Sequence, residues 1–249
     1  MGISIISKSN WLFRVKEILI LLFLCGPINV IKGECMINPD EDGNVEVPNT
    51  QTAIPDNAFN GCTKLLTITI PDSVKSIGTR AFYQASELQD IVIPDSVTQL
   101  GTEAFFQATS LYSADLGQGL TAVPTKTFYQ ATGLTEATLG DKVASIGDSA
   151  FQGCAALMNS KGSTEFVIPD SVTTVGQNAF EGASSLGNVV LGEKVSQVPT
   201  SAFKNCGSLY LAEINAKVFD CTPFSKTYTT TDTGIKFLKT ATDITNTVG

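Results

Sequence analysis

Apolar residues recur along the chain with a period of 23 residues. Phenylalanines mark this period, with one step of 29, at Phe59, Phe82, Phe105, Phe128, Phe151, Phe180 and Phe203. A leucine follows each of them six residues later, at Leu65, Leu88, Leu111, Leu134, Leu157, Leu186 and Leu209. Further columns of Ile, Val and Leu keep the same phase. So many columns with one period indicate an internal repeat, whose units bury a continuous core by stacking.

Each repeat predicts a short strand, a turn and a helical segment. Residues 65–71 (LLTITIP) alternate between apolar and polar in the manner of a half-buried strand. The following turn points Val74 and Ile77 inward. Asp or Thr, the types that cap helix N-termini, stands three residues before most of the phenylalanines, at Asp56, Thr79, Thr102, Thr125, Asp148 and Thr200. We therefore expect an α/β solenoid with one short strand and one short helical segment, such as 79–85, per repeat.

The longer step and the two ends modify this pattern. Six extra polar residues lie within 158–166 (MNSKGSTEF) and predict a surface bulge in a continuous stack. We expect the solenoid to span 34–216, with 34–56 as a degenerate N-terminal cap repeat. The Thr-rich stretch 217–249 is expected either to cap the other end or to fray. Caps are expected because an open solenoid end exposes core and strand edges.

Residues 1–33 have the pattern of a secretory signal peptide. The apolar run 18–25 (ILILLFLC) is shorter than a membrane span and follows three basic residues, Lys8, Arg14 and Lys16. Cleavage is expected after Gly26 or Gly33, and the alternative is a short uncleaved anchor. No second apolar stretch of membrane length follows, so we expect the mature chain to be secreted or at the cell surface without a membrane span.

Charge and composition exclude several classes of function. Residues 1–33 hold four of the 16 basic and one of the 24 acidic residues, so the net charge without them is −11. Such an acidic chain disfavours nucleic acid and anionic membranes as partners. The chain has no histidine, which removes the usual general base, Ser–His and Cys–His pairs and His-containing metal sites. We expect no enzymatic activity, no cofactor and no metal site.

The columns resemble the BspA-like leucine-rich repeats. Residues 88–111 (LQDIVIPDSVTQLGTEAFFQATSL) follow that family's pattern nearly residue for residue, and the resemblance covers about 34–216. Alanine replaces the pattern's cysteine in four repeats, whereas Cys62, Cys154 and Cys206 keep it. The resemblance implies a leucine-rich-repeat solenoid, curved into a right-handed superhelix. It also implies a secreted or cell-surface protein that binds other proteins, and it names no ligand.

Five cysteines remain beyond residue 33, namely Cys35, Cys62, Cys154, Cys206 and Cys221. An odd number in an exported protein suggests one free thiol and up to two bridges. Because Cys35 and Cys221 lie in the two caps, Cys35–Cys62 and Cys206–Cys221 are the predicted bridges. The alternative is that these cysteines are buried free thiols.

Two surface columns are candidate protein-binding sites. Outward strand positions form an acidic strip that suits a basic or polar segment, with Asp90, Asp115, Glu136, Glu165 and Glu213. Alternatively, these are solvated positions that block sheet aggregation. The second column follows the core phenylalanines with Tyr83, Phe106 and Tyr129. These rings form either an exposed contact patch or an intramolecular stack.

Together, the repeats and the two columns predict an exported protein-binding or adhesion module that acts through its repeat surface. The partner is an unidentified protein ligand, and the oligomeric state is open. The alternative function is a passive extracellular spacer that self-associates and has no specific partner.

Overall fold

The computed structural model describes residues 35–196, 198–199 and 201–209. It also describes the backbone of three strands, β14 (Leu211–Ile214), β15 (Tyr228–Thr231) and β16 (Gly234–Phe237). All of these residues belong to one compact unit, Lys32–Gly249. The expected signal peptide 1–33, Cys221 and most of the expected C-terminal cap lie outside the described residues.

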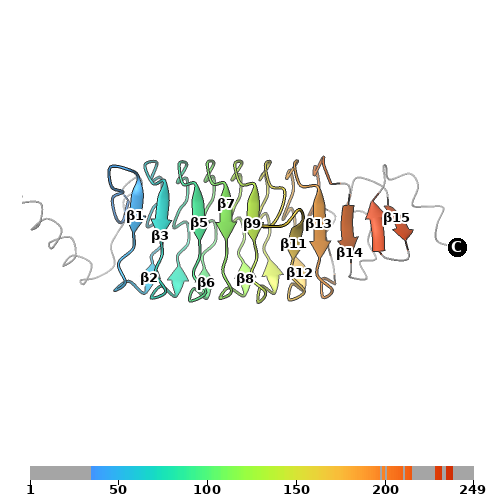
Figure 1. Cartoon of the computed structure of the whole chain (residues 1–249), viewed down its shortest axis with the longest axis horizontal. Coiled ribbons are helices and arrows are strands. Elements are labelled where there is room, and N and C mark those ends of the chain that lie inside the picture. The colour runs from blue at the N-terminus through green and yellow to red at the C-terminus, as the bar shows by residue number, and fades with distance from the viewer. Residues whose placement is uncertain are drawn as a thin grey trace, which may run out of the picture. The chain divides into compact units, whose positions relative to one another are not determined.

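The repeats contribute one row of longer strands. This row consists of β1 (Asn44–Glu46), β3 (Thr67–Thr69), β5 (Asp90–Val92), β7 (Ser113–Asp115), β9 (Glu136–Thr138), β11 (Phe166–Ile168), β13 (Asn188–Leu191) and β14. Its members pair in parallel as β1–β3, β5–β7–β9 and β11–β13–β14. We call the outward side of this row the strand face (Figure 1).

A second row of two-residue strands runs beside the first (Figure 1). It consists of β2 (Ala53–Ile54), β4 (Ser76–Ile77), β6 (Gln99–Leu100), β8 (Ala122–Val123), β10 (Ser145–Ile146) and β12 (Thr174–Val175). These strands pair in parallel as β2–β4–β6 and β8–β10–β12. The stretch that the sequence predicts as a plain turn therefore contains a second short strand. Farther along the chain, β15 and β16 form an antiparallel pair.

The predicted phenylalanine column is confirmed. All seven rings are at most 1% exposed. Consecutive rings stack with centroids 5.0–5.2 Å apart, and this holds from Phe59 to Phe203. Phe166 packs edge-on against Phe151 and Phe180. The aromatic spine thus runs without a gap through the repeats, including the step of 29 residues.

The predicted helical segments are wrong, because the described residues contain no helix. Around Phe82 the chain makes successive tight turns, with Arg80 and Gln84 at a φ of 56°. Alternate amides bind the next repeat: Phe82 N–H donates to the carbonyl of Ala104 and Gln84 N–H to that of Phe106, both at 2.7 Å. An α-helix would use these N–H groups internally. Here they build a third hydrogen-bonded ladder along the stack, on a side that we call the turn face.

The two aspartates among the expected helix caps accept backbone N–H groups of the next repeat instead. The Asp56 carboxylate accepts from Thr79 N–H at 2.7 Å, and Asp148 accepts from Gln177 N–H at 2.8 Å. Thr200 lies outside the described residues. Two aspartates that follow the longer strands act in the same way, as Asp95 accepts from Gln118 N–H and Asp170 from Glu193 N–H. These recurring carboxylates therefore tie consecutive repeats together.

The six extra residues form an ordered bulge between β9 and β11. Asn159 bridges to Glu136 before the chain leaves the sheet. Ser160 holds the base of the bulge, because its N–H donates to the carbonyl of Glu165 at 2.9 Å and its hydroxyl accepts from Val167 N–H at 3.0 Å. Lys161 N–H donates to the hydroxyl of Thr138 at 3.1 Å. The insertion thus lies on the strand face and leaves the core stack continuous.

A candidate protein-binding surface on the strand face

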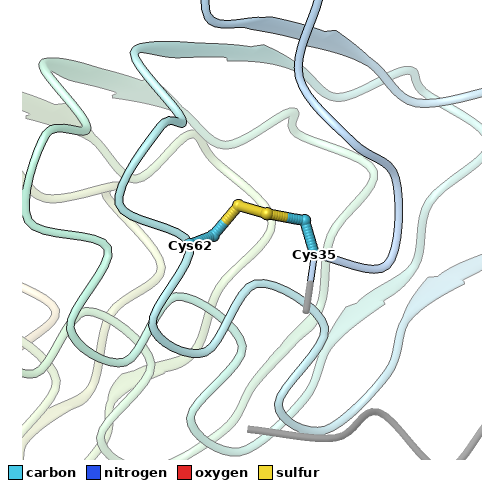
Figure 2. Close-up of a disulfide and its surroundings, with 2 residues drawn as sticks. All are labelled: Cys35 and Cys62. Atoms are coloured by element: carbon cyan, nitrogen blue, oxygen red, sulfur yellow. A yellow bond between two sulfur atoms is a disulfide. The ribbon is translucent and has the colours of Figure 1, made fainter. Parts of the chain in front are cut away.

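Cys35 and Cys62 form a disulfide in the N-terminal repeat, with their Cα atoms 5.5 Å apart (Figure 2). Cys62 is buried at 1% exposure and follows the core ring of Phe59 by three residues. The adjoining Met36 N–H donates to the carbonyl of Ala58 at 2.6 Å. This bridge fastens the start of the solenoid to its first stacked turn, which is a structural role.

Cys154 and Cys206 have free, buried thiols. Each thiol donates to a core carbonyl, Cys154 to Phe128 at 3.0 Å and Cys206 to Phe180 at 3.1 Å. Burial raises the pKa of Cys206 to about 12 and also raises the pKa of Cys154. Both stay protonated at neutral pH and lack the thiolate that a nucleophile or metal ligand needs. Cys206 is free, and its expected partner Cys221 lies outside the described residues.

The aromatic column Tyr83, Phe106 and Tyr129 forms a ladder. Ring centroids lie 4.7 Å apart between Tyr83 and Phe106 and 4.8 Å apart between Phe106 and Tyr129, and all three residues are half-buried. Arg80 and Lys126 lie over the outer two rings, 5.4 Å and 5.9 Å from their centroids. Each ring covers its neighbour, so the geometry is that of an intramolecular stack.

Polar side chains on the turn face also pair with the next repeat. The amide of Gln84 donates to Gln107 at 2.9 Å, and that of Gln107 donates to Gln130 at 2.8 Å. Ion pairs join neighbouring repeats as well, with Arg80–Glu103 at 2.6 Å and Lys204–Glu181 at 3.2 Å. The turn face therefore satisfies much of its own hydrogen-bonding capacity.

On the strand face, the register distributes the predicted acidic residues over two rows. Ser113 pairs with Asp90 on one side and Glu136 on the other. Asp115 lies in the second row, where it pairs with Val92 and Thr138. The two remaining residues lie apart from these. Glu165 directly precedes β11. Glu213 lies in β14, where only the backbone is described, and pairs with Val190 of β13.

These strand-face carboxylates are largely unpaired. Within the part of the chain that the structure describes, the side chains of Asp90 and Glu136 make no hydrogen bond or ion pair, whereas Asp115 accepts from Gly117 N–H at 3.1 Å. The outward positions of β1, β3, β5, β7 and β9 include four carboxylates and neither Lys nor Arg. The strand face is thus acidic and free to accept donors.

Two exposed apolar residues occur in or directly before these strands. Val92 is 56% exposed and Tyr112, directly before β7, is 55% exposed. Tyr112 occupies a column that holds Leu66, Gln89, Thr135 and Met158 in other repeats, as their backbone bonds show. Sequence reasoning missed Tyr112 because this varied column lies at the corner before the strand and carries no periodic signal.

Other chemistry finds little support in the structure. Among the residues described, no group of three or more Cys, Asp and Glu is placed to hold a metal ion. No helix long and apolar enough to cross a membrane occurs in the same part of the chain. The outward groups of the candidate site are carboxylates, hydroxyls and a few apolar side chains.

Comparisons with known proteins agree with this architecture. Residues 31–158 and 155–248 match a family model described as BspA type leucine rich repeat region, with six copies. A leucine-rich repeat protein from Bacteroides ovatus shares 28% identity and superposes with a TM-score of 0.53, covering 69% of this chain. This chain spans about half of that protein, 48% of its length.

A T. pallidum leucine rich repeat protein shares the fold at 23% identity and a TM-score of 0.50. This match covers 74% of this chain and 79% of that protein. No curated protein matches the sequence.

Proposed function

This chain belongs to the BspA-type leucine-rich repeat family, and from that premise we propose that it is an exported protein-binding module that contacts its partner through the strand face. Stacked repeats place one residue from each copy side by side, which gives a broad surface suited to a partner of protein size. The proposal includes no catalytic step. The proposed location outside the cytoplasm is supported by the Cys35–Cys62 bridge, because disulfides persist in oxidising compartments.

The difference between the two faces carries this proposal. Turn-face side chains bind one another across repeats, as the Gln84–Gln107 amide pair and the Arg80–Glu103 ion pair show. On the strand face, the side chains of Asp90 and Glu136 make no hydrogen bond or ion pair with any described residue. The outward positions of the neighbouring strands, where a Lys or Arg could pair with them, hold neither. Unpaired carboxylates on strands that also carry or follow the exposed Val92 and Tyr112 give this part of the surface both polar and apolar groups, as protein interfaces have.

A retention experiment with paired variants tests the strand face. The full chain is immobilised and exposed to extracellular proteins, and retained proteins are identified by mass spectrometry. Thr69→Arg with Val92→Arg adds two bulky cations to exposed strand-face positions. Thr121→Arg with Ala144→Arg adds the same charge at exposed positions just before β8 and β10. We expect the first pair to reduce retention of specific partners about tenfold. The added cations repel a basic partner segment, and their bulk blocks close contact with the face.

The control pair should retain the same proteins as the wild type. Equal retention by both variants would contradict a strand-face contact. Retention of nothing but further copies of the chain itself would also contradict it and would favour a self-associating spacer.

A further inference from the structure

The bulge between β9 and β11 consists of residues 160–165 and contains a lysine followed by a glycine. Lys161, Gly162 and Thr164 are exposed, and Ser163 is half-buried. Gly162 adopts a φ of 75°, and apart from its chain neighbours no atom lies within 4 Å of the place that a Cβ would occupy on it. The tip of the bulge therefore faces open space.

One hydrogen bond joins this tip to another repeat. It runs from Lys161 N–H to the hydroxyl of Thr138, at 3.1 Å. Ser163 N–H donates within the bulge, to the carbonyl of Ser160 at 2.9 Å. The N–H of Gly162 has no acceptor in the described part of the chain. The bulge can therefore open locally while the ladders that join the repeats stay intact.

Core residues lie closer to the other basic residues of the described chain. Each of these is followed within two positions by a residue that is at most 2% exposed, as Lys142 is followed by Val143. After Lys161 the first buried residue is Phe166, five positions later. The other basic residues are Lys64, Lys75, Arg80, Lys126, Lys142, Lys194 and Lys204.

This difference determines where an endopeptidase can act on the folded chain. Cleavage requires a segment to leave its folded position, so it is fastest where opening displaces the fewest packed residues. Exposed loop tips with small and polar residues are the preferred places. Trypsin-like enzymes also require a basic residue before the cleaved bond, because their specificity pocket contains a carboxylate.

We propose that the Lys161–Gly162 bond is a processing site, which a trypsin-like endopeptidase cleaves while the solenoid stays folded. The reaction is hydrolysis. The amide bond breaks, water supplies the second oxygen of a new carboxylate at Lys161, and Gly162 gains a free ammonium group. The inference goes beyond the proposed partner contact and does not depend on it.

The two halves should remain associated after cleavage, because the core is continuous across the bulge. Phe151 stacks on Phe180 at 5.1 Å, and Phe166 packs edge-on against both. Phe151 N–H donates to the carbonyl of Ala179 at 2.7 Å, and β10 pairs with β12. The processed protein is therefore a two-chain solenoid with two new chain ends on the strand face.

Limited digestion of the full chain with trypsin, followed by intact-mass spectrometry, tests this site. Between residues 35 and 196, the bond after Lys161 should be cut first and about tenfold faster than any other, because the remaining bonds require a repeat to unfold. The two fragments should elute together in gel filtration and separate in urea. Cuts in 1–34 and 197–249 are scored separately.

Matched variants separate the bulge from the exposure of lysine alone. Lys161→Gln should remove the fast cut, whereas Lys142→Gln removes another exposed lysine and should leave its rate unchanged. Thr138→Val removes the acceptor of Lys161 N–H and should raise the rate of this cut several-fold without changing cuts elsewhere. Valine is tolerated in that register row, where Val92 occurs.

A first cut elsewhere between residues 35 and 196 would overturn the processing site, as would equal effects of Lys161→Gln and Lys142→Gln. Cleavage of Thr138→Val at the wild-type rate would contradict opening of the bulge as the controlling step. Fragments that separate without urea would contradict the two-chain solenoid. No partner protein takes part in these measurements, so their outcome is independent of the retention experiment.

Discussion

Phe105→Ala should lower the free energy of unfolding by about 3–5 kcal/mol, because it opens a cavity in the middle of the aromatic spine. The Phe105 ring is fully buried between Phe82 and Phe128, with centroids 5.0 Å and 5.2 Å away. In a stacked array each repeat is held mainly by its neighbours, so a defect at this position uncouples the units on either side. Urea unfolding followed by circular dichroism measures the loss.

The adjacent residue offers a matched control. Phe106→Ala removes the same ring from the half-buried turn-face ladder and should cost clearly less than Phe105→Ala. A Phe105→Ala chain as stable as the wild type would contradict the stacked core, as would equal losses for the two substitutions.

Removing the Cys35–Cys62 bridge should cost about 3–4 kcal/mol, the loop-closure contribution of a disulfide of this span. The two cysteines are 27 residues apart in sequence. In the double variant Cys35→Ser with Cys62→Ala, alanine replaces Cys62 because Ala85 and Ala108 fill the same buried position in the next repeats. Urea unfolding with and without reductant should show that reductant destabilises the wild type and leaves the double variant unchanged.

Cys154→Ala is the control for that experiment, because its free thiol is fully buried and contributes packing but no bridge. Its loss of stability should be the smaller one and independent of reductant. Alkylation of the unfolded wild type without reductant should leave Cys35 and Cys62 unlabelled. Labelling of both residues would contradict the bridge.

The core was readable from the sequence because each of its positions repeats. Phe82, Leu88 and Ile93 recur in phase with their copies, and stacking similar units leaves little choice of partner. Asp95 and Asp170 each follow a proline after a strand, which is typical of a turn, but the pattern does not show that they accept N–H groups of the next repeat.

The turn face was misjudged for a definite physical reason. Thr79 and the Ala-Phe pair that follows have the residue types of a helix start. Such local signals take no account of hydrogen bonds to a neighbouring repeat. The N–H of Phe82 binds the carbonyl of Ala104 in the next repeat and is not available for a helical hydrogen bond. Arg80 and Gln84 adopt positive φ values, which the sequence does not indicate because neither residue is glycine. Strand β4 was missed because its two residues are too short to show alternation.

The candidate site was only half predictable. Alternation placed Asp90 and Glu136 outward, and their alignment followed from the period. That Asp90 and Glu136 have no cationic partner among the described residues depends on the side chains of neighbouring strands, where Ser113 stands between them in the register. The exposure of Tyr112 likewise arises from its place at a corner of the solenoid.

Carbodiimide labelling of carboxylates, with and without the proteins that the immobilised chain retains, tests the strand face most directly. Unpaired Asp90 and Glu136 should react rapidly in the free chain. Glu103 and Glu181 should react slowly, because they are ion-paired and their side chains are only 18% and 17% exposed. A bound partner should protect Asp90 and Glu136 and leave Glu103 and Glu181 unchanged. Protection of Glu103 and Glu181 with Asp90 and Glu136 unchanged would contradict the strand face as the contact surface.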